Sequence, residues 1–260
     1  MNILEPGQEQ IKLLFDRSHF PILERWNLLD SVLTEYVKDQ LIADPSFITK
    51  ADQHIEAVEC TVDRELRSLA GSIGIDNSVS LPEAELSEKM VQFGVPFASK
   101  KAAIYRAQMI ELWAELEFSP LKDSLYIKYK EPLTSISYTL LRSSSEEIVQ
   151  ECYCKILNDE STLEELALRL SEGPESSSAG CLGPLCVHEM DPLIAGLLLN
   201  SPVHQVQKPQ KIDRWWVILR VNSIHPLQLD DQTMKKIYSI ELSSKVREAA
   251  QQMKSTLLSK

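Results

Sequence analysis

Apolar side chains in the first 120 residues recur at steps of three and four, the spacing that places them on one face of a helix. The patterns predict helices over residues 21–36, 55–69, 80–94 and 104–116. Pro21 is tolerated at a first helical position, and Gly71 is typical of a helix end. The first of these helices would present on one face Ile22, Trp26, Leu29, Leu33 and Tyr36.

The pattern changes near residue 135. Ile136, Tyr138 and Leu140 alternate with serine and threonine, and this period of two predicts a strand. Helices are expected over 148–156 and 163–170, the second introduced by a capping box that begins at Ser161.

A polar loop over 172–178 and a glycine-containing turn over 180–183 follow these helices. Asp191-Pro192 predicts the start of another short helix, because aspartate caps a helix and proline suits its first turn. Two strands are then expected, over 203–206 and over 215–221. The last expected element is a long helix over 233–259.

Together these elements predict an α+β protein with three segments. Residues 1–120 would form a helical lobe, 121–226 a small antiparallel sheet flanked by helices, and 227–260 a C-terminal helix that packs on the first lobe. The middle segment, about 100 residues long, has the size of an ordinary domain.

Composition disfavours several classes of function and indicates a cellular compartment. The formal net charge of −11 disfavours binding to nucleic-acid phosphates and to anionic membranes. The densest apolar run, over 193–199, is far shorter than the ~20 residues that a membrane span needs. The opening MNILEPGQEQ has no basic or apolar region typical of a signal peptide, and the five cysteines form no disulfide framework. We therefore expect reduced thiols and a cytoplasmic location.

Three short sequences in the middle segment carry a family resemblance. They are Leu166-Ala167 followed by Leu170-Ser171-Glu172-Gly173, then Ala179-Gly180-Cys181-Leu182-Gly183-Pro184, then Trp215-Trp216-Val217-Ile218. Their order and spacing over 121–226 resemble the parvulin (rotamase, PpiC-type) peptidyl-prolyl isomerases. The helical segments on either side look like those of SurA/PrsA-type chaperones, in which a C-terminal helix completes the N-terminal lobe.

The resemblance implies an apolar pocket for the proline ring. Its three side chains fall on Leu182, Met190 and Ile194, the last in place of the usual aromatic residue. Met190 and Ile194 are one helical turn apart, so both can face one cavity, and methionine suits an adaptable apolar lining. The residues by themselves favour ordinary core packing, whereas the resemblance favours the pocket.

The family's polar site groups are replaced in this sequence. The first-strand histidine falls on Tyr138, or on Thr139 if the alignment shifts by one residue, and the closing-strand histidine falls on Trp216. The usual cysteine or aspartate falls on Gly173. Tyr138 can donate a hydrogen bond, and Trp216 could pack against it to form the floor of a groove. The alternative is that both rings belong to the core of the sheet.

The first hypothesis is therefore a peptidyl-prolyl isomerase and chaperone that binds unfolded, proline-containing polypeptide without a cofactor, with weak catalysis. The second is a non-catalytic holdase or adaptor that keeps a secreted or maturing substrate unfolded, with a secretion apparatus as a candidate partner. The third is metal or redox regulation through Cys181, Cys186 and His188, which lie close in sequence but lack a paired zinc motif. We expect no bound metal.

Overall fold

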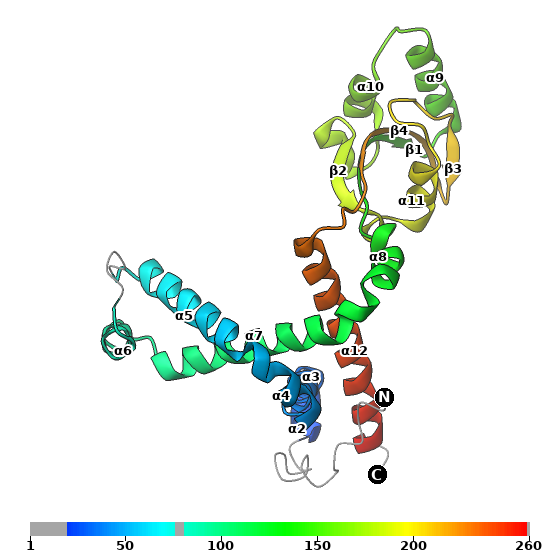
Figure 1. The fold of residues 1–260 in the computed structure, drawn as a ribbon. Helices are drawn as coiled ribbons and strands as arrows, with labels where there is room; N and C mark the ends of the chain where they lie inside the picture. The colour runs from blue at the N-terminus through cyan, green and yellow to red at the C-terminus, as the bar shows by residue number, and fades with distance from the viewer. Residues whose placement is uncertain (1–19, 76–80, 259–260) are drawn as a thin grey trace. The chain divides into compact units, whose positions relative to one another are not determined.

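The computed structural model describes residues 20–75 and 81–258. The chain divides into two compact units, which we treat separately (Figure 1). Unit 1 comprises Met1–Leu121 with Lys235–Lys260, and unit 2 comprises Lys122–Met234. The described part is a helical unit and a unit with a sheet flanked by helices, so the expected α+β class is confirmed. The opening decapeptide, Ser80 and Ser259 lie outside the described residues.

The described part of unit 1 consists of helices. They are α2 (Phe20–Arg25), α3 (Leu29–Ile42), α4 (Pro45–Ala51), α5 (Ile55–Ser72), α6 (Glu83–Gln92), α7 (Phe97–Phe118) and, from Lys235 onward, α12 (Asp231–Leu258). Short 3₁₀ turns, η2 (Asp52–His54) and η3 (Ser119–Leu121), follow α4 and α7.

The predicted first helix is divided into two. Asn27 has a φ of +54°, a left-handed conformation that interrupts helical geometry, and it separates α2 from α3. Ile22 and Trp26, placed by the periodicity on the buried face, are 44% and 64% exposed. Leu29, Leu33 and Tyr36 are buried as expected. Of the predicted stripe only the residues on α3 are buried, whereas α2 buries Phe20 instead of Ile22 and Trp26.

Aromatic packing joins the end of α7 to α12 within unit 1. Phe118 is fully buried and meets Trp113 edge-on, with ring centroids 5.9 Å apart. The ring of Tyr238 also lies near Phe118, with the two ring centroids 6.1 Å apart. The C-terminal helix thus contributes to the core of the N-terminal unit.

Unit 2 is built on a four-stranded antiparallel sheet of order β2-β1-β4-β3. The strands are β1 (Ser135–Ser143), β2 (Cys181–Cys186), β3 (Gln210–Ile212) and β4 (Trp215–His225). The helices are α8 (Lys122–Lys130), α9 (Glu146–Leu157), α10 (Leu163–Leu170) and α11 (Pro192–Leu199), with 3₁₀ turns η4 (Pro174–Ser178) and η5 (Val187–Glu189).

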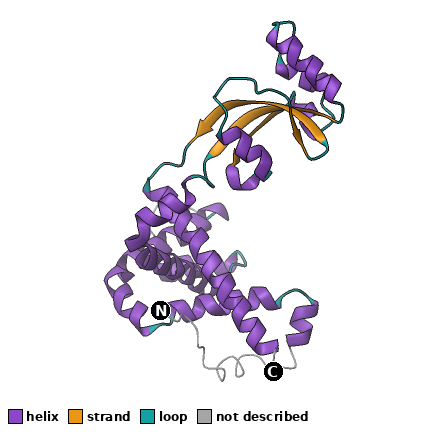
Figure 2. Cartoon of the chain, turned by 90° about the vertical axis from the view of Figure 1, so that its right-hand side faces the viewer, coloured by secondary structure: helices purple, strands orange, loops and turns teal. Residues whose placement is uncertain are grey.

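Helices lie on both sides of this sheet (Figure 2). We call the side that packs against α11 the α11 face; its buried residues include Ile136, Tyr138, Leu140, Val217 and Val221. The other side, the α10 face, packs against α9 and α10; its buried residues include Leu141, Val149, Leu163, Leu166 and Ile218. Side chains alternate between the two faces along β1 and β4, as the strand period requires.

Several elements differ from the sequence prediction. The turn expected over 180–183 overlaps the start of β2, a strand that the sequence did not predict, and β3, α4 and α8 were not predicted either. Residues 203–206 form only isolated bridges, at Val203 and Val206, instead of a strand. The capping box begins one residue later than expected, with Thr162 and Glu165 as its two partners.

Gly180 allows β1 and α10 to approach each other closely. Its φ is +77°, and a Cβ atom there would lie 2.6 Å from the Leu140 carbonyl oxygen and 2.7 Å from the Ala167 Cβ. A residue with a side chain would be strained by both the backbone angle and these contacts.

Among the described residues, none of the helices combines the length and apolarity that crossing a bilayer would require.

Candidate functional site

Tyr138 lies at the centre of the α11 face. It is 5% exposed, and its cross-strand neighbour on β2 is Leu182. Side chains directly opposite each other on antiparallel strands are in contact range, and Leu182 remains partly exposed there. The strand pairing thus places one predicted pocket residue beside the predicted polar residue.

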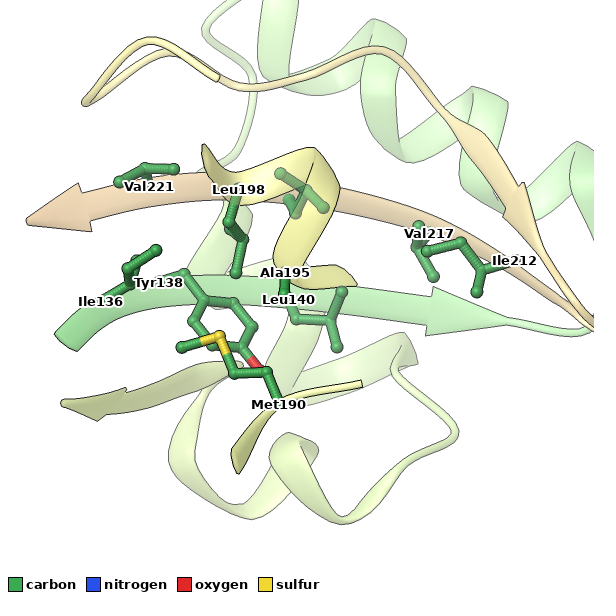
Figure 3. Packing of buried hydrophobic residues seen from close by; sticks show 10 residues of the cluster. Ile136, Tyr138, Leu140, Met190, Ala195, Leu198, Ile212, Val217 and Val221 are labelled. Carbon is green, nitrogen blue, oxygen red and sulfur yellow. The ribbon is translucent and has the colours of Figure 1, made fainter. Parts of the chain in front are cut away.

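Met190 and Ile194 approach the same face from the start of α11. The Asp191 carboxylate caps this helix by accepting bonds from the Leu193 and Ile194 amides at 2.9 and 3.3 Å. Figure 3 shows the Met190 side chain lying along the Tyr138 ring, with Ala195 and Leu198 of α11 above the sheet. Met190 is 9% exposed, whereas Ile194 keeps part of its surface open to solvent.

The three predicted pocket residues therefore gather on one face. Leu182 and Ile194 pack against the buried cluster that contains Met190 and Tyr138. Two partly exposed aliphatic side chains around a buried methionine and phenol can contact an apolar ring that lies on them. Their role in holding proline stays a prediction.

Trp216 does not join this group. It packs against the α10 face, beside Ile218, whereas Tyr138 lies on the α11 face. The residue of β4 that shares the face of Tyr138 is the adjacent Val217. A shift of one residue along a strand moves a side chain to the opposite face. The expected packing of Trp216 on Tyr138 as a common floor is thus wrong, and Val217 is the β4 residue that faces the site.

Thr139, the other position considered for the first-strand histidine, also lies on the α10 face. Its hydroxyl accepts a 3.0 Å bond from Asn222 Nδ2 and lies 3.3 Å from Glu164 Oε1, to which it can donate its one proton. Arg220 pairs with the same Glu164 carboxylate. This polar cluster ties α10 to β1 and β4 and leaves Tyr138 as the first-strand candidate.

An ion pair missed by the sequence reasoning occupies the space beside Gly173. The Arg142 guanidinium contacts Glu175, with Nη2 2.9 Å from Oε2. Glu175 is 3% exposed and also accepts a 2.6 Å bond from the Ser171 hydroxyl. A Cβ atom on Gly173 would stand 2.0 Å from Arg142 Nε and 2.1 Å from Glu175 Oε2. Glycine is the residue that leaves room for this pair.

Both partners of the ion pair influence Tyr138. Burial raises the pKa of the Tyr138 hydroxyl above its usual value, and the Glu175 carboxylate raises it further. The Arg142 guanidinium acts in the opposite direction and lowers that pKa. The net shift is upward, so the Tyr138 hydroxyl is neutral at neutral pH and keeps its proton for donation.

A protein-family model matches most of unit 2. Residues 128–223 match the rotamase family, described as the PPIC-type PPIASE domain. These residues form a PPIC-type PPIase domain. The matched range contains the whole site described above, from Tyr138 on β1 to Val217 on β4. The match supports the peptidyl-prolyl isomerase function expected from the sequence.

The similar solved structures cover more of the chain than the family model does, but at low sequence identity and low TM-score. The chain is similar to PrsA from Bacillus anthracis (15% identity, 86% of this chain and 97% of that chain, TM-score 0.39). It is also similar to PrsA from Bacillus cereus (18%, 93% and 86%, TM-score 0.40). A third similar structure is a SurA-like chaperone of Campylobacter jejuni (16%, 95% and 86%, TM-score 0.36). No curated protein matches the sequence.

The cysteines of the PPIase domain do not form the metal cluster considered above. Cys181 is paired with Thr139 and Cys186 with Ser135, so the two lie at opposite ends of β2. The His188 ring nitrogen Nδ1 is 2.9 Å from the Pro132 carbonyl oxygen. Within residues 20–75 and 81–258, no three potential metal-binding side chains of the His, Cys, Asp or Glu type come together.

Proposed function

We propose that the PPIase domain binds an X–Pro segment of an extended or unfolded polypeptide and accelerates its cis–trans isomerisation. The proline ring would lie on Leu182, Met190 and Ile194, and Tyr138 would border it. The observation that carries the proposal is the convergence of these side chains on the α11 face of a domain that matches this family.

Prolyl isomerisation requires only that the protein binds the peptide and provides a suitable environment for the X–Pro amide. Rotation about the amide bond breaks its resonance and costs roughly 18–20 kcal/mol in water. No covalent bond has to form, so the catalyst must favour the twisted amide over both planar forms. Apolar surroundings serve this purpose, because the planar amide is the more polar state and loses more on leaving water.

Met190→Ala is expected to slow peptide exchange about 5- to 30-fold at limiting peptide, because roughly 1–2 kcal/mol of apolar contact to the proline ring is lost. Exchange NMR of an X–Pro peptide with and without protein measures this rate. Met190 also contributes to the core, so thermal unfolding of each variant is recorded beside the exchange rate.

Ile194→Ala serves as a second variant because Ile194 is less buried than Met190. Leu168→Ala is the matched control: Leu168 is 59% exposed on α10, which covers the opposite side of the sheet. A wild-type protein that leaves exchange unchanged rules out the isomerase activity. If the Met190→Ala and Ile194→Ala proteins are folded and give the same exchange rate as Leu168→Ala, the proline ring does not bind on Met190 and Ile194.

A second candidate function is a holdase without turnover. The observation that favours it is the replacement of the family's polar groups by Tyr138, Trp216 and Gly173. Suppression of aggregation of an unfolded client, without acceleration of prolyl exchange, distinguishes the holdase from the isomerase.

Unit 1 contains a groove suited to an extended chain. The groove, of about 450 Å³, lies between α7 and α12 with Lys38 of α3 at its edge. Ala107, Ile110 and Leu242 form its apolar part, and Glu111 and Glu115 border it. We propose that this groove holds apolar segments of the unfolded client.

Ala107→Trp is expected to fill this groove and reduce aggregation suppression at least about threefold, since an indole takes the space of the client side chains. Ala103→Trp, one helical turn earlier on α7 and outside the groove lining, is the control. Light scattering of a chemically denatured client on dilution provides the measurement. Equal protection by the two variants contradicts the assignment.

We also propose a cytoplasmic location, with a secretion apparatus as the candidate partner. The support is that Cys60, Cys154 and Cys181 are exposed thiols that form no disulfide within the described part of the chain. Exposed free thiols are typical of reducing compartments. Cell fractionation tests the location, and recovery in an extracytoplasmic fraction contradicts it.

A further inference from the structure

The Arg142–Glu175 ion pair lies where the family's polar side chain would stand. By the resemblance, that side chain belongs to position 173, which is glycine here. The atoms nearest to a Cβ built on Gly173 are Arg142 Nε at 2.0 Å, Glu175 Oε2 at 2.1 Å and Arg142 Nη2 at 2.2 Å. Position 173 therefore carries no polar side chain, and the Arg142 guanidinium from β1 occupies the space where one would lie.

We propose that Arg142 is the hydrogen-bond donor of this PPIase domain, and that its guanidinium donates to the X–Pro peptide group bound on the α11 face. The proposal rests on the proposed isomerase function and names the group that would act in it. Glu175 is then a positioning residue, which holds the guanidinium without touching the substrate.

The first argument is the position of Arg142 on the sheet. It follows Tyr138 and Leu140 at steps of two along β1, and its cross-strand neighbour on β4 is Val217 of the α11 face. Its guanidinium carbon lies 5.4 Å from the ring centroid of Trp215, which packs against the same cluster. The Arg142 side chain keeps 25% of its surface exposed, while its Nε atom is buried.

The second argument is the way in which the guanidinium is held. The side chain of Glu175 is only 2% exposed, and its two oxygens are used by Arg142 and by the Ser171 hydroxyl. The Arg142 amide donates to the same hydroxyl at 3.1 Å, and the Glu172 amide donates to the Arg142 carbonyl at 2.9 Å. Burying an ion pair costs desolvation that an apolar pair of similar size avoids. The bonds of its amide and carbonyl fix the backbone of Arg142, Glu175 pairs with Nη2 of its guanidinium, and the buried Nε has no hydrogen-bond partner among the described residues.

The third argument concerns the chemistry of the twisted amide. Resonance in the planar amide places electron density on the carbonyl oxygen, and twisting returns the electron pair to the prolyl nitrogen. A cationic N–H donor aimed at that nitrogen interacts more strongly with the twisted form than with either planar form. Such an interaction raises kcat and leaves KM nearly unchanged.

The test uses the full-length protein and an X–Pro peptide, with kcat and KM from exchange NMR and peptide affinity from a separate titration. The double variant Arg142→Met/Glu175→Leu removes the donor without leaving a buried unpaired charge. We expect a fall in kcat of about 10- to 100-fold, the contribution of one charged hydrogen bond, with peptide affinity within about threefold. Arg142→Lys retains a cationic donor and should recover part of the lost kcat.

Arg214→Gln is the matched control. The Arg214 guanidinium lies 4.8 Å from the same Trp215 ring, so the variant removes a similar stacked cation from another position. An unchanged kcat in the Arg142→Met/Glu175→Leu protein overturns the proposal while the isomerase function stands. An equal loss in Arg214→Gln also overturns it, because general positive charge would then explain the effect. A wild-type protein that binds peptide but does not accelerate exchange removes the isomerase function itself, and the proposal with it.

Discussion

Phe118→Ala is expected to lower the free energy of unfolding of unit 1 by about 3–5 kcal/mol. Phe118 is fully buried at the end of α7, near Trp113 and Tyr238. Truncation removes the transfer free energy of the ring and leaves a cavity that two neighbouring rings fill only in part. Because Tyr238 belongs to α12, the cavity also weakens the attachment of the C-terminal helix to the N-terminal unit.

Hydrogen exchange of backbone amides measures this effect unit by unit. Amides of α7 and α12 should lose protection in Phe118→Ala, whereas amides of β1 and β4 should keep theirs. Phe93→Ala, at a position 58% exposed, is the control and should change stability by less than about 0.5 kcal/mol. Unchanged protection of α12 amides in Phe118→Ala would show that the terminal helix does not depend on this aromatic contact.

Glu175→Ala is expected to destabilise unit 2 by about 3 kcal/mol, because it leaves the partly buried Arg142 guanidinium without its counter-charge. The Ser171 hydroxyl loses its acceptor in the same variant. Some of the cost is relieved because the Arg142 side chain is 25% exposed and can reach water. Chemical denaturation followed through the fluorescence of Trp215 and Trp216 measures the change.

The matched comparison is the Arg142→Met/Glu175→Leu protein, which should recover most of the lost stability. An apolar pair of similar volume avoids the desolvation cost of the ions, so breaking the pair is more harmful than replacing it. Recovery of stability without recovery of kcat would separate the functional role of the pair from its contribution to the fold. A Glu175→Ala protein as stable as wild type would mean that the pair contributes nothing to folding.

Much of the secondary structure follows from local patterns. The steps of three and four in α5 and the alternation in β1 each reflect a single amphipathic element, and such patterns are visible within ten to twenty residues. The gathering of Leu182, Met190 and Ile194 was also anticipated, through the family resemblance. Short elements with little periodicity, such as β2 and β3, depend on pairing with β1 and β4 and were missed.

The sequence by itself determined which residues are apolar, how they alternate, and that the family's polar positions are replaced. Only the tertiary structure decided that Val217 and not Trp216 faces Tyr138, because a strand's pleat and pairing register assign each side chain to a face. Only the tertiary structure joined Arg142 to Glu175 beside Gly173. That pair connects β1 to the turn before β2. Its two residues are far apart in the sequence, so no pattern within a single helix or strand could predict that they make contact.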